Sequence, residues 1–549
     1  CNGGAAICFG CGNDLLQIDT GAIFTGIVGG GTGTDTLEFL ASSHGSLTNT
    51  FTNFEIAKLD SAANWTLGGD NSFVTINNAG TLTTAGALSD TGTFINTGSL
   101  LGTGQLVESG ALNNSGYVGQ TVTLTGSGAL NNSGTINAAT GVYRDGTGTG
   151  TLVNTGNITG TSGYGIQLAS ASTVKNGDAS HTAATIGGYR AGIYFTSTAG
   201  TVTNYGTISG TAAGSQGITL NYGGVVDNKS TGVISGDAFG IGLIGAGTIT
   251  NSGTITSASG DGVLLNAGGS FTNSGSSSYI YGGLFGVKGR GGVNVINNAG
   301  TILGDTGVAF TDNFGTYNNT VINTGTIKGT GGVALQFGAG DDLLELGPGA
   351  VFDGTIEGGA GNNAVELLSG VNFTGAASGF DGFSTFQIDN GASWTFNGTA
   401  DTIAAGTTFT NQGSLDVTGT LTNAGVINGA NGLTDSGAFT NTGSIGGTVV
   451  LDGIGTLNNS GAITAASGYG VFATAGSEGT LTNSGTITGV GDGIFLDNGG
   501  QVTNSGSASY ISGAAGIKTQ NGTATVINEV TIIGTVGNGV YLAGGGSVK

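Results

Sequence analysis

The sequence is poor in charge, proline and methionine. Of its 549 residues only 8% are charged, one is proline (Pro348) and none is methionine, whereas 117 are glycine. No stretch carries a sustained 3.6-residue apolar period or the roughly 18 apolar residues of a membrane-spanning helix. We therefore expect almost no helix and no transmembrane segment. Glycine-rich chains are often disordered, but the fixed repeat register described below argues against disorder here.

Basic residues are also scarce. The chain has 10 Lys and Arg against 32 Asp and Glu, a formal net charge of −22. Nucleic acids and anionic membranes are recognised through clustered basic side chains, so this surface should repel both. The composition favours neutral glycans, proteins, cations or further copies of the chain as partners.

Cysteine is confined to the N-terminus, at Cys1, Cys8 and Cys11. This placement indicates an oxidising compartment in which one disulfide staples the terminal coil and a third thiol is left over. A Cys-x-x-Cys metal or redox site at Cys8 and Cys11 is an alternative, although no second pair and no nearby histidine completes it. A lipidated mature terminus at Cys1 is another.

The strongest signal is an asparagine, usually followed by a small residue, glycine and a β-branched pair, that recurs at intervals of 18 to 28 residues in two runs, the first ending at Asn323 and the second starting at Asn423. A period near 20 residues is typical of a solenoid. We expect equivalent asparagines to stack in successive coils and to bond through their amides; the alternative is that they only form turns. The predicted ladder consists of Asn78, Asn96, Asn114, Asn132, Asn154, Asn176, Asn204, Asn228, Asn251, Asn273, Asn298, Asn323, Asn423, Asn441, Asn459, Asn483, Asn504 and Asn528.

A second element repeats in step with the asparagines. It is a glycine, then Ile or Val, one further residue, and usually Leu or Phe, as in Gly192–Phe195 and Gly262–Leu265. With a third short strand such as Gly247–Thr250, each coil of about 18–25 residues holds three strands. The predicted fold is all-β: a right-handed, single-stranded parallel β-helix whose coils bury one continuous core.

A long duplication overlies the short repeat. The segment from Gly12 to Phe24 aligns without a gap to the segment from Gly340 to Phe352, and Trp65 aligns with Trp394. We therefore predict a first module at 1–328, with its tryptophan block at 54–67 and rungs at 78–327. A second copy at 329–549, with its tryptophan block at 383–396 and rungs at 423–549, is cut short in mid-coil. Both tryptophans should be buried, and we expect a fragment or processed product of a longer protein.

The rungs Asn251–Ile255 and Asn483–Ile487, together with the block Phe383–Trp394, resemble the passenger domains of Gram-negative autotransporters, the large repeat adhesins exported by type V secretion. The resemblance implies export across two membranes and an extracellular place on the bacterial surface, attached to the outer membrane or released. Membrane contact would come only through a missing anchor or translocator domain. The partners implied are host or neighbouring-cell glycans or proteins, or copies of the chain itself.

One motif is a candidate calcium turn. Gly30–Glu38 fits the nonapeptide Gly-Gly-x-Gly-x-Asp-x-apolar-x, in which turn carbonyls and Asp35 supply oxygen ligands. Related turns bring Asp14 and Asp342, while a fourth carries Asn363 instead of aspartate. Calcium rolls repeat every nine residues, however, and these copies are about one coil apart. The alternative is a Gly-Asp turn at a solenoid corner; no other cofactor is expected.

Catalysis has little support in the sequence. His44 and His181 lie in no nucleophile or metal motif, and none of the three arginines, Arg144 included, falls near a carboxylate cluster in the repeat register. The leading prediction is a non-catalytic cell-surface stalk or adhesin passenger. The alternatives are a self-assembling extracellular filament or surface-layer subunit, and a glycan-cleaving β-helix enzyme. Five tyrosines indicate either an aromatic glycan-binding strip or ordinary core and edge packing: Tyr164, Tyr194, Tyr279, Tyr281 and Tyr510.

Overall fold

The computed structural model describes residues 4–311 and 315–549. They form short parallel strands, each paired with the equivalent strand of the coil before and the coil after, together with one 3-10 helix, η1 (Ala377–Gly379). This arrangement confirms the predicted all-β parallel β-solenoid. Within the described ranges, no helix has the length and apolar character needed to cross a bilayer.

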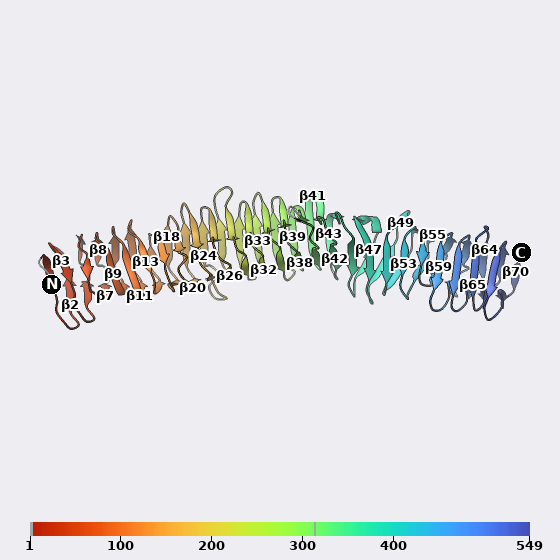
Figure 1. The fold of residues 1–549 in the computed structure, drawn as a ribbon, viewed down its shortest axis with the longest axis horizontal. Helices are drawn as coiled ribbons and strands as arrows, with labels where there is room; N and C mark the ends of the chain where they lie inside the picture. Colours follow the sequence, from red (N-terminus) through yellow and green to blue (C-terminus); the bar gives the residue numbers. More distant parts are fainter. Residues whose placement is uncertain (1–3, 312–314) are drawn as a thin grey trace. The chain divides into compact units, whose positions relative to one another are not determined.

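The chain forms two compact units. Unit 1 comprises residues 1–315 and 328–331, and unit 2 comprises residues 316–327 and 332–549. Within each unit the strands follow one another in chain order as stacked coils, from β2 to β39 in unit 1 and from β42 to β70 in unit 2 (Figure 1). The duplication places its own boundary between residues 328 and 329.

Each coil of unit 1 contributes to three faces, named here the ladder face, the tryptophan face and the third face. The ladder face holds β2 (Leu15–Ile18), β4 (Thr36–Phe39), β7 (Ile56–Leu59), β9 (Asn71–Asn78), β11 (Leu88–Asn96), β14 (Ala111–Asn114), β17 (Ala129–Asn132), β20 (Gly150–Asn154), β23 (Ser172–Asn176), β26 (Gly200–Asn204), β29 (Gly224–Asn228), β32 (Gly247–Asn251), β35 (Gly269–Asn273) and β38 (Asn294–Asn298).

The tryptophan face of unit 1 holds β5 (His44–Leu47), β8 (Asn64–Leu67), β10 (Thr81–Thr84), β12 (Ser99–Gly102), β15 (Tyr117–Val118), β18 (Thr135–Ala138), β21 (Asn157–Gly160), β24 (Thr185–Gly188), β27 (Thr207–Gly210), β30 (Val233–Gly236), β33 (Thr254–Ser257), β36 (Tyr279–Gly282) and the start of β39 (Thr301–Phe310). The third face holds β13 (Leu106–Glu108), β16 (Val122–Leu124), β19 (Val142–Arg144), β22 (Tyr164–Leu168), β25 (Ala191–Phe195), β28 (Gln216–Leu220), β31 (Phe239–Leu243), β34 (Asp261–Leu265) and β37 (Phe285–Gly289). Before them, β1 (Ala5–Cys8), β3 (Ile27–Gly29) and β6 (Phe51–Thr52) form a separate sheet.

Strand residues alternate between the core and the surface, as the period-2 pattern predicts. On the third face both apolar positions of the Gly-Ile motif are buried, for example Ile193 and Phe195. The preceding glycine is required by close packing. A Cβ added at Gly192 would lie 2.6 Å from Cγ2 of Ile208 on the tryptophan face and 2.8 Å from the carbonyl oxygen of Gly217 in the next coil.

Unit 2 has the same three kinds of face. Its ladder face holds β49 (Asp401–Ile403), β52 (Thr420–Asn423), β55 (Ala438–Asn441), β58 (Thr456–Asn459), β61 (Thr480–Asn483), β64 (Gly500–Asn504), β67 (Ala524–Asn528) and β70 (Gly546–Val548). Its tryptophan face holds β45 (Asn372–Thr374), β48 (Ser393–Phe396), β51 (Ser414–Val417), β54 (Leu433–Asp435), β57 (Val449–Leu451), β60 (Val471–Ala473), β63 (Ile494–Leu496), β66 (Ile517–Thr519) and β69 (Val540–Leu542).

The third face of unit 2 holds β40 (Thr320–Asn323), β42 (Leu343–Leu346), β44 (Asn363–Leu367), β47 (Phe383–Ile388), β50 (Thr408–Asn411), β53 (Val426–Asn428), β56 (Ser444–Ile445), β59 (Ala462–Ala465), β62 (Thr486–Gly489), β65 (Tyr510–Gly513) and β68 (Thr531–Gly534). Outside these stacks lie β43 (Val351–Glu357), β46 (Phe380–Asp381) and β41 (Thr326–Gln336), which spans the unit boundary.

The ladder occupies a different face, relative to the tryptophan strand, in the two units. In unit 1 the ladder lies on the face that contains β7, the strand directly before the Trp65 strand β8. In unit 2 it lies on the face that contains β49, the strand directly after the Trp394 strand β48. No strand is lost at this point, because β50 pairs with β53 eighteen residues later (Thr408 with Val426) and β49 pairs with β52 twenty residues later (Asp401 with Leu421). The face changes because the rung asparagines of unit 2 begin on the strand after the tryptophan strand, where Asn423 follows Ile403 in register.

Candidate functional site

The asparagine ladder is continuous over most of unit 1. From Asn78 to Asn298, each side-chain Nδ2 donates to Oδ1 of the next rung, at distances from 2.6 to 2.9 Å. The side chains are buried, and most Nδ2 groups also donate to a backbone carbonyl, as Asn154 does to Gly156 at 3.0 Å. An interpretation of these residues as turn formers alone does not account for such bonds.

Unit 2 carries a second, shorter ladder. Its bonds run from Asn423 through Asn441, Asn459, Asn483 and Asn504 to Asn528, at 2.7 or 2.8 Å. Within unit 2, Asn323 is the last asparagine of the first predicted run, and its register partner in the next coil is Leu346. Asn411 is likewise buried outside the ladder and donates to the carbonyl of Gly432 at 2.7 Å.

The predicted calcium turns serve as corners between coils. Oδ1 of Asp35 accepts the backbone N–H of Asp14 at 2.7 Å, and Oδ1 of Asp342 accepts that of Asn319 at 2.6 Å. The side-chain amide oxygen of Asn363 likewise accepts a hydrogen bond from the backbone N–H of Asp342, at 2.9 Å. In residues 4–311 and 315–549, no group of three or more His, Cys, Asp or Glu side chains is placed to hold a metal ion. Calcium binding at these turns stays a prediction.

The cysteines do not form a Cys-x-x-Cys site. Cys8 is disulfide-bonded, whereas Cys11 is a free, exposed thiol. Cys1 lies outside the described residues. One disulfide and one free thiol near the first coil leave no metal or redox pair between Cys8 and Cys11.

Both tryptophans are fully buried, as predicted, but their surroundings differ. The indole N–H of Trp65 donates to Oγ of Ser43 at 2.7 Å, and its ring lies against Gly45, where an added Cβ would be 2.5 Å from the ring. The indole N–H of Trp394 donates to the carbonyl of Gly375 at 3.0 Å. Five phenylalanine rings lie with centroids 4.6–5.7 Å from that of Trp394: Phe373, Phe380, Phe386, Phe396 and Phe409.

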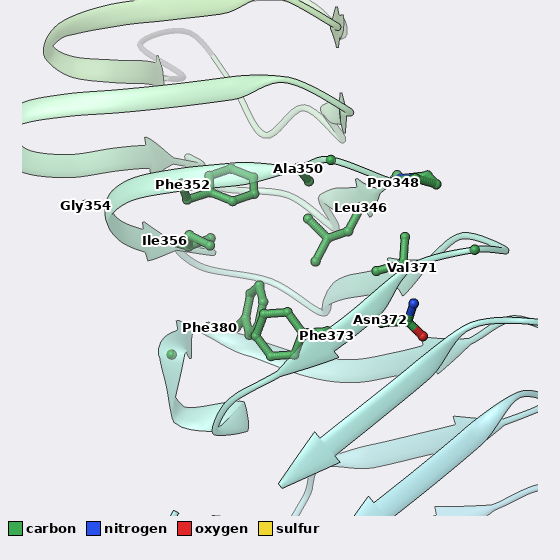
Figure 2. A pocket seen from close by; sticks show the side chains of 14 residues that line it. Leu346, Pro348, Ala350, Phe352, Gly354, Ile356, Val371, Asn372, Phe373 and Phe380 are labelled. Carbon is green, nitrogen blue, oxygen red and sulfur yellow. The ribbon is translucent and has the colours of Figure 1, made fainter. Parts of the chain in front are cut away.

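A fissure separates two consecutive coils beside Trp394. β43 pairs with the following coil only through Ile356 and Glu357, so its first residues lie apart from that coil. Between them is a cavity of about 460 Å³. In Figure 2, Phe352 and Ile356 line one wall, and Phe373 and Phe380 line the other. We name this cavity the coil fissure.

At the equivalent position of unit 1, side chains bridge the two neighbouring coils. The N–H of His44 donates to Oγ1 of Thr20 at 3.2 Å, which joins the edge strand β5 to the preceding coil. Nδ2 of Asn49 donates to the carbonyls of Phe24 and Gly26, at 3.3 and 2.7 Å. In the second copy the residues that align around Asn49 are Ala377 and Ser378, which lack an amide. The two copies therefore differ in sequence at a residue that bridges the coils. Aligning the copies did not by itself reveal that this difference accompanies a fissure.

A column of ionisable side chains points into the core of unit 1. Asp90 and Glu108 lie in register on neighbouring strands, and Arg144 follows two coils later in the same column. All three are fully buried. Leu124 lies between Glu108 and Arg144 in this column, so the guanidinium does not adjoin the carboxylate pair. Because these groups face the closed interior, a polysaccharide outside the solenoid does not reach them.

Burial dominates the electrostatics of this column. It raises the pKa of Asp90 and of Glu108, and the charge of Asp90 raises the pKa of Glu108 further. Burial lowers the pKa of Arg144, whose guanidinium donates to the carbonyls of Gly126 and Gly128. Unit 2 has one comparable group, Asp435, whose pKa burial raises to about 7.

The five predicted tyrosines do not form one strip. Tyr164 and Tyr194 stack at 4.9 Å on the third face of unit 1, whereas Tyr279 and Tyr281 lie on its tryptophan face. Tyr510 lies on the third face of unit 2. A stack that the sequence did not suggest lies on the tryptophan face of unit 2: Tyr469 and Phe495 are 4.9 Å apart, and Nζ of Lys518 is 5.5 Å from the Phe495 ring.

No protein-family model, no curated protein and no solved structure matches this chain.

Proposed function

We propose that the chain is a non-catalytic, extracellular shaft of a bacterial surface adhesin of the autotransporter-passenger type. The observation that carries the proposal is the asparagine ladder, which links every coil from Asn78 to Asn298 and again from Asn423 to Asn528 through amides that are buried except at the last rung. A shaft needs many equivalent coils that resist opening, and a ladder supplies the same buried bond at each coil. Each such bond contributes about 1 kcal/mol net, and more is lost when a buried partner is left unsatisfied.

The composition supports a place outside the cell. Trypsin cleaves after Lys and Arg, and unit 2 has neither between Lys328 and Lys518. The parallel ladder leaves few backbone groups of inner coils open to proteases. Cys8 in a disulfide fits an oxidising compartment. The repeated rungs that resemble autotransporter passengers favour surface attachment or release, with glycans, proteins or further copies of the chain as partners.

A paired assay tests the proposal against its alternatives. The purified chain would be incubated with a panel of neutral and acidic polysaccharides while reducing ends are measured, and its adhesion to glycan-coated beads and its sedimentation would be followed in parallel. We expect adhesion without any release of reducing ends. Release of reducing ends would support a glycan-cleaving enzyme and overturn the proposal. Growth of long polymers without adhesion would instead support a filament or surface-layer subunit.

A further inference from the structure

The coil fissure exposes the edge of a β-strand inside the solenoid. β45 is the first strand of its sheet and pairs with β48 alone. Its bonds to β48 involve the carbonyl of Val371, which accepts from Ser393 at 2.8 Å, and the N–H of Gly375, which donates to Thr395 at 3.0 Å. In a strand the N–H and C=O of one residue point to the same edge and those of the next residue to the opposite edge, so the N–H and C=O groups of Asn372 and Thr374 point toward the fissure.

The walls beside this edge are apolar. Of the residues that line it, Ile356, Val371 and Phe380 are buried, while Phe352 and Phe373 are half-buried. Figure 2 shows the rings of Phe352, Phe373 and Phe380 directed into the same space. An unpaired edge next to apolar pockets is the combination that recognises an extended peptide by strand addition: the backbone supplies affinity and the pockets accept alternate side chains.

The charge around the fissure specifies the peptide. The coils that form it carry Glu345, Glu357 and Glu366, and the residues that line it include no Lys or Arg. Burial, with the neighbouring charges of Asp389 and Glu345, raises the pKa of Glu366, which is the response of a carboxylate in an uncompensated acidic surface. A bound cation would relieve this repulsion.

We propose that the coil fissure binds an extended segment of a partner protein that alternates apolar and basic side chains and pairs as a strand with β45. The apolar side chains enter the space between Phe352 and Phe373, and the basic side chains face the acidic coils. This binding site is separate from the proposed shaft function, since a shaft needs no such opening.

The first copy supplies a matched control. Ala350 lines the fissure, and its aligned residue Ala22 lies where side chains of Thr20, His44 and Asn49 bridge the coils. A bulky residue at position 350 fills the fissure, whereas the same change at position 22 leaves the second copy untouched. Ala350→Phe and Ala22→Phe therefore change the same kind of residue with opposite expectations for binding.

The test uses the full chain and a short capped peptide of alternating lysine and valine, titrated by calorimetry with hydrogen exchange read across residues 370–375. We expect saturable binding and slower exchange of Asn372 and Thr374. Ala350→Phe should weaken binding by about tenfold or more, which corresponds to roughly 1.4 kcal/mol, and Ala22→Phe should not.

Two further peptides, tested on the unmodified chain, keep the result independent of any folding defect in the variants. The same peptide with alternate backbone nitrogens methylated cannot form the ladder bonds and should bind about tenfold more weakly. A glutamate-valine peptide should not bind. Absence of binding by the lysine-valine peptide, equal binding of the methylated form, or equal binding to Ala350→Phe would each overturn strand addition at this site. Equal binding of the acidic peptide would overturn the assigned charge preference.

Discussion

The two tryptophan blocks start from nearly the same sequence and reach different packing. Trp65 has one phenylalanine ring nearby, Phe39 at 5.3 Å, and lies over Gly45, whereas five rings surround Trp394. The residue aligned with Gly45 is Phe373, a wall of the coil fissure. Added aromatic volume in the second copy thus accompanies an opening between coils that the first copy bridges with Thr20 and Asn49.

The surface charge of the two copies differs at aligned positions as well. In the first copy Lys58 pairs with Glu38 and, at 2.9 Å, with Asp60, and its hydrogen bond lowers the pKa of Glu38. In the second copy Gln387 stands at the aligned position and bonds to Glu366 and Asp389 at 2.9 and 2.8 Å. The difference between Lys58 and Gln387 therefore leaves the carboxylates of the second copy without the cation that the first copy has. A more acidic surface favours different partners.

The largest expected effect comes from removing each indole. Trp394→Ala and Trp65→Ala should each destabilise the surrounding coils by about 3–5 kcal/mol, with the greater loss at Trp394 because five rings lose a neighbour. Chemical denaturation, with hydrogen exchange to localise the loss, would measure both. An equal or greater loss at Trp65 would show that ring contacts do not set the difference between the copies.

The ladder should be nearly as sensitive. Asn204→Ala removes the side-chain acceptor of Asn176 and the amide donor to Oδ1 of Asn228, and should cost about 2–3 kcal/mol in the adjoining coils. Asn411→Ala removes a buried amide that is outside the ladder and breaks one bond to Gly432, so a smaller loss of about 1 kcal/mol is expected. Similar losses, read by hydrogen exchange in the flanking strands, would argue against any special contribution of stacking.

The buried carboxylates predict a pH dependence of the opposite sign to that of a salt-bridged acid. Their folded-state pKa values are raised, so the folded state keeps protons that the unfolded chain releases above about pH 4. Stability is therefore fully present below about pH 4 and falls as pH rises, by about 1.4 kcal/mol per pH unit for each retained proton. For Asp435 the decline should end near its folded pKa of about 7.

Denaturation across pH, followed in strands β11 and β13 of unit 1 and in β54 of unit 2, would test this. Glu108→Gln should flatten the slope in unit 1 only, and Asp435→Asn should flatten it in unit 2 only. Stability that increased with pH in the unmodified chain would contradict the assignment of retained protons.

The smallest effect is expected from substitutions that exchange the charge pattern of the two copies. Gln387→Lys reproduces the contacts of Lys58 and should lower the pKa of Glu366, with a gain in stability of roughly 0.2–1 kcal/mol because the pair is partly exposed. Carboxyl resonances followed by NMR during a pH titration would report the shift. Lys58→Gln should raise the pKa of Glu38 in return. Should neither pKa move, the difference between the columns does not depend on this residue.

Much of the fold could be predicted because the repeated sequence motifs determine the coil. The asparagine spacing indicated the coil, and the Gly-Ile motif indicated core positions such as Ile193. The coil fissure could not be predicted, since it depends on which coils fail to pair and on single differences such as Asn49 against Ala377. Asp90, Glu108 and Arg144 were missed for a related reason: coils of unequal length hide the shared inward column until the strand register is known.

The change of ladder face between the two units has a consequence for how coils can be exchanged within such a chain. In unit 1 the ladder strand comes directly before the tryptophan strand, and in unit 2 it comes directly after it. An exchange of whole coils within one unit keeps every asparagine on its face and leaves the amide column unbroken. A coil copied from one unit into the other, in register with the tryptophan strand, places its asparagine on the wrong face and interrupts the column. The ladder therefore confines the productive exchange of coils to each unit.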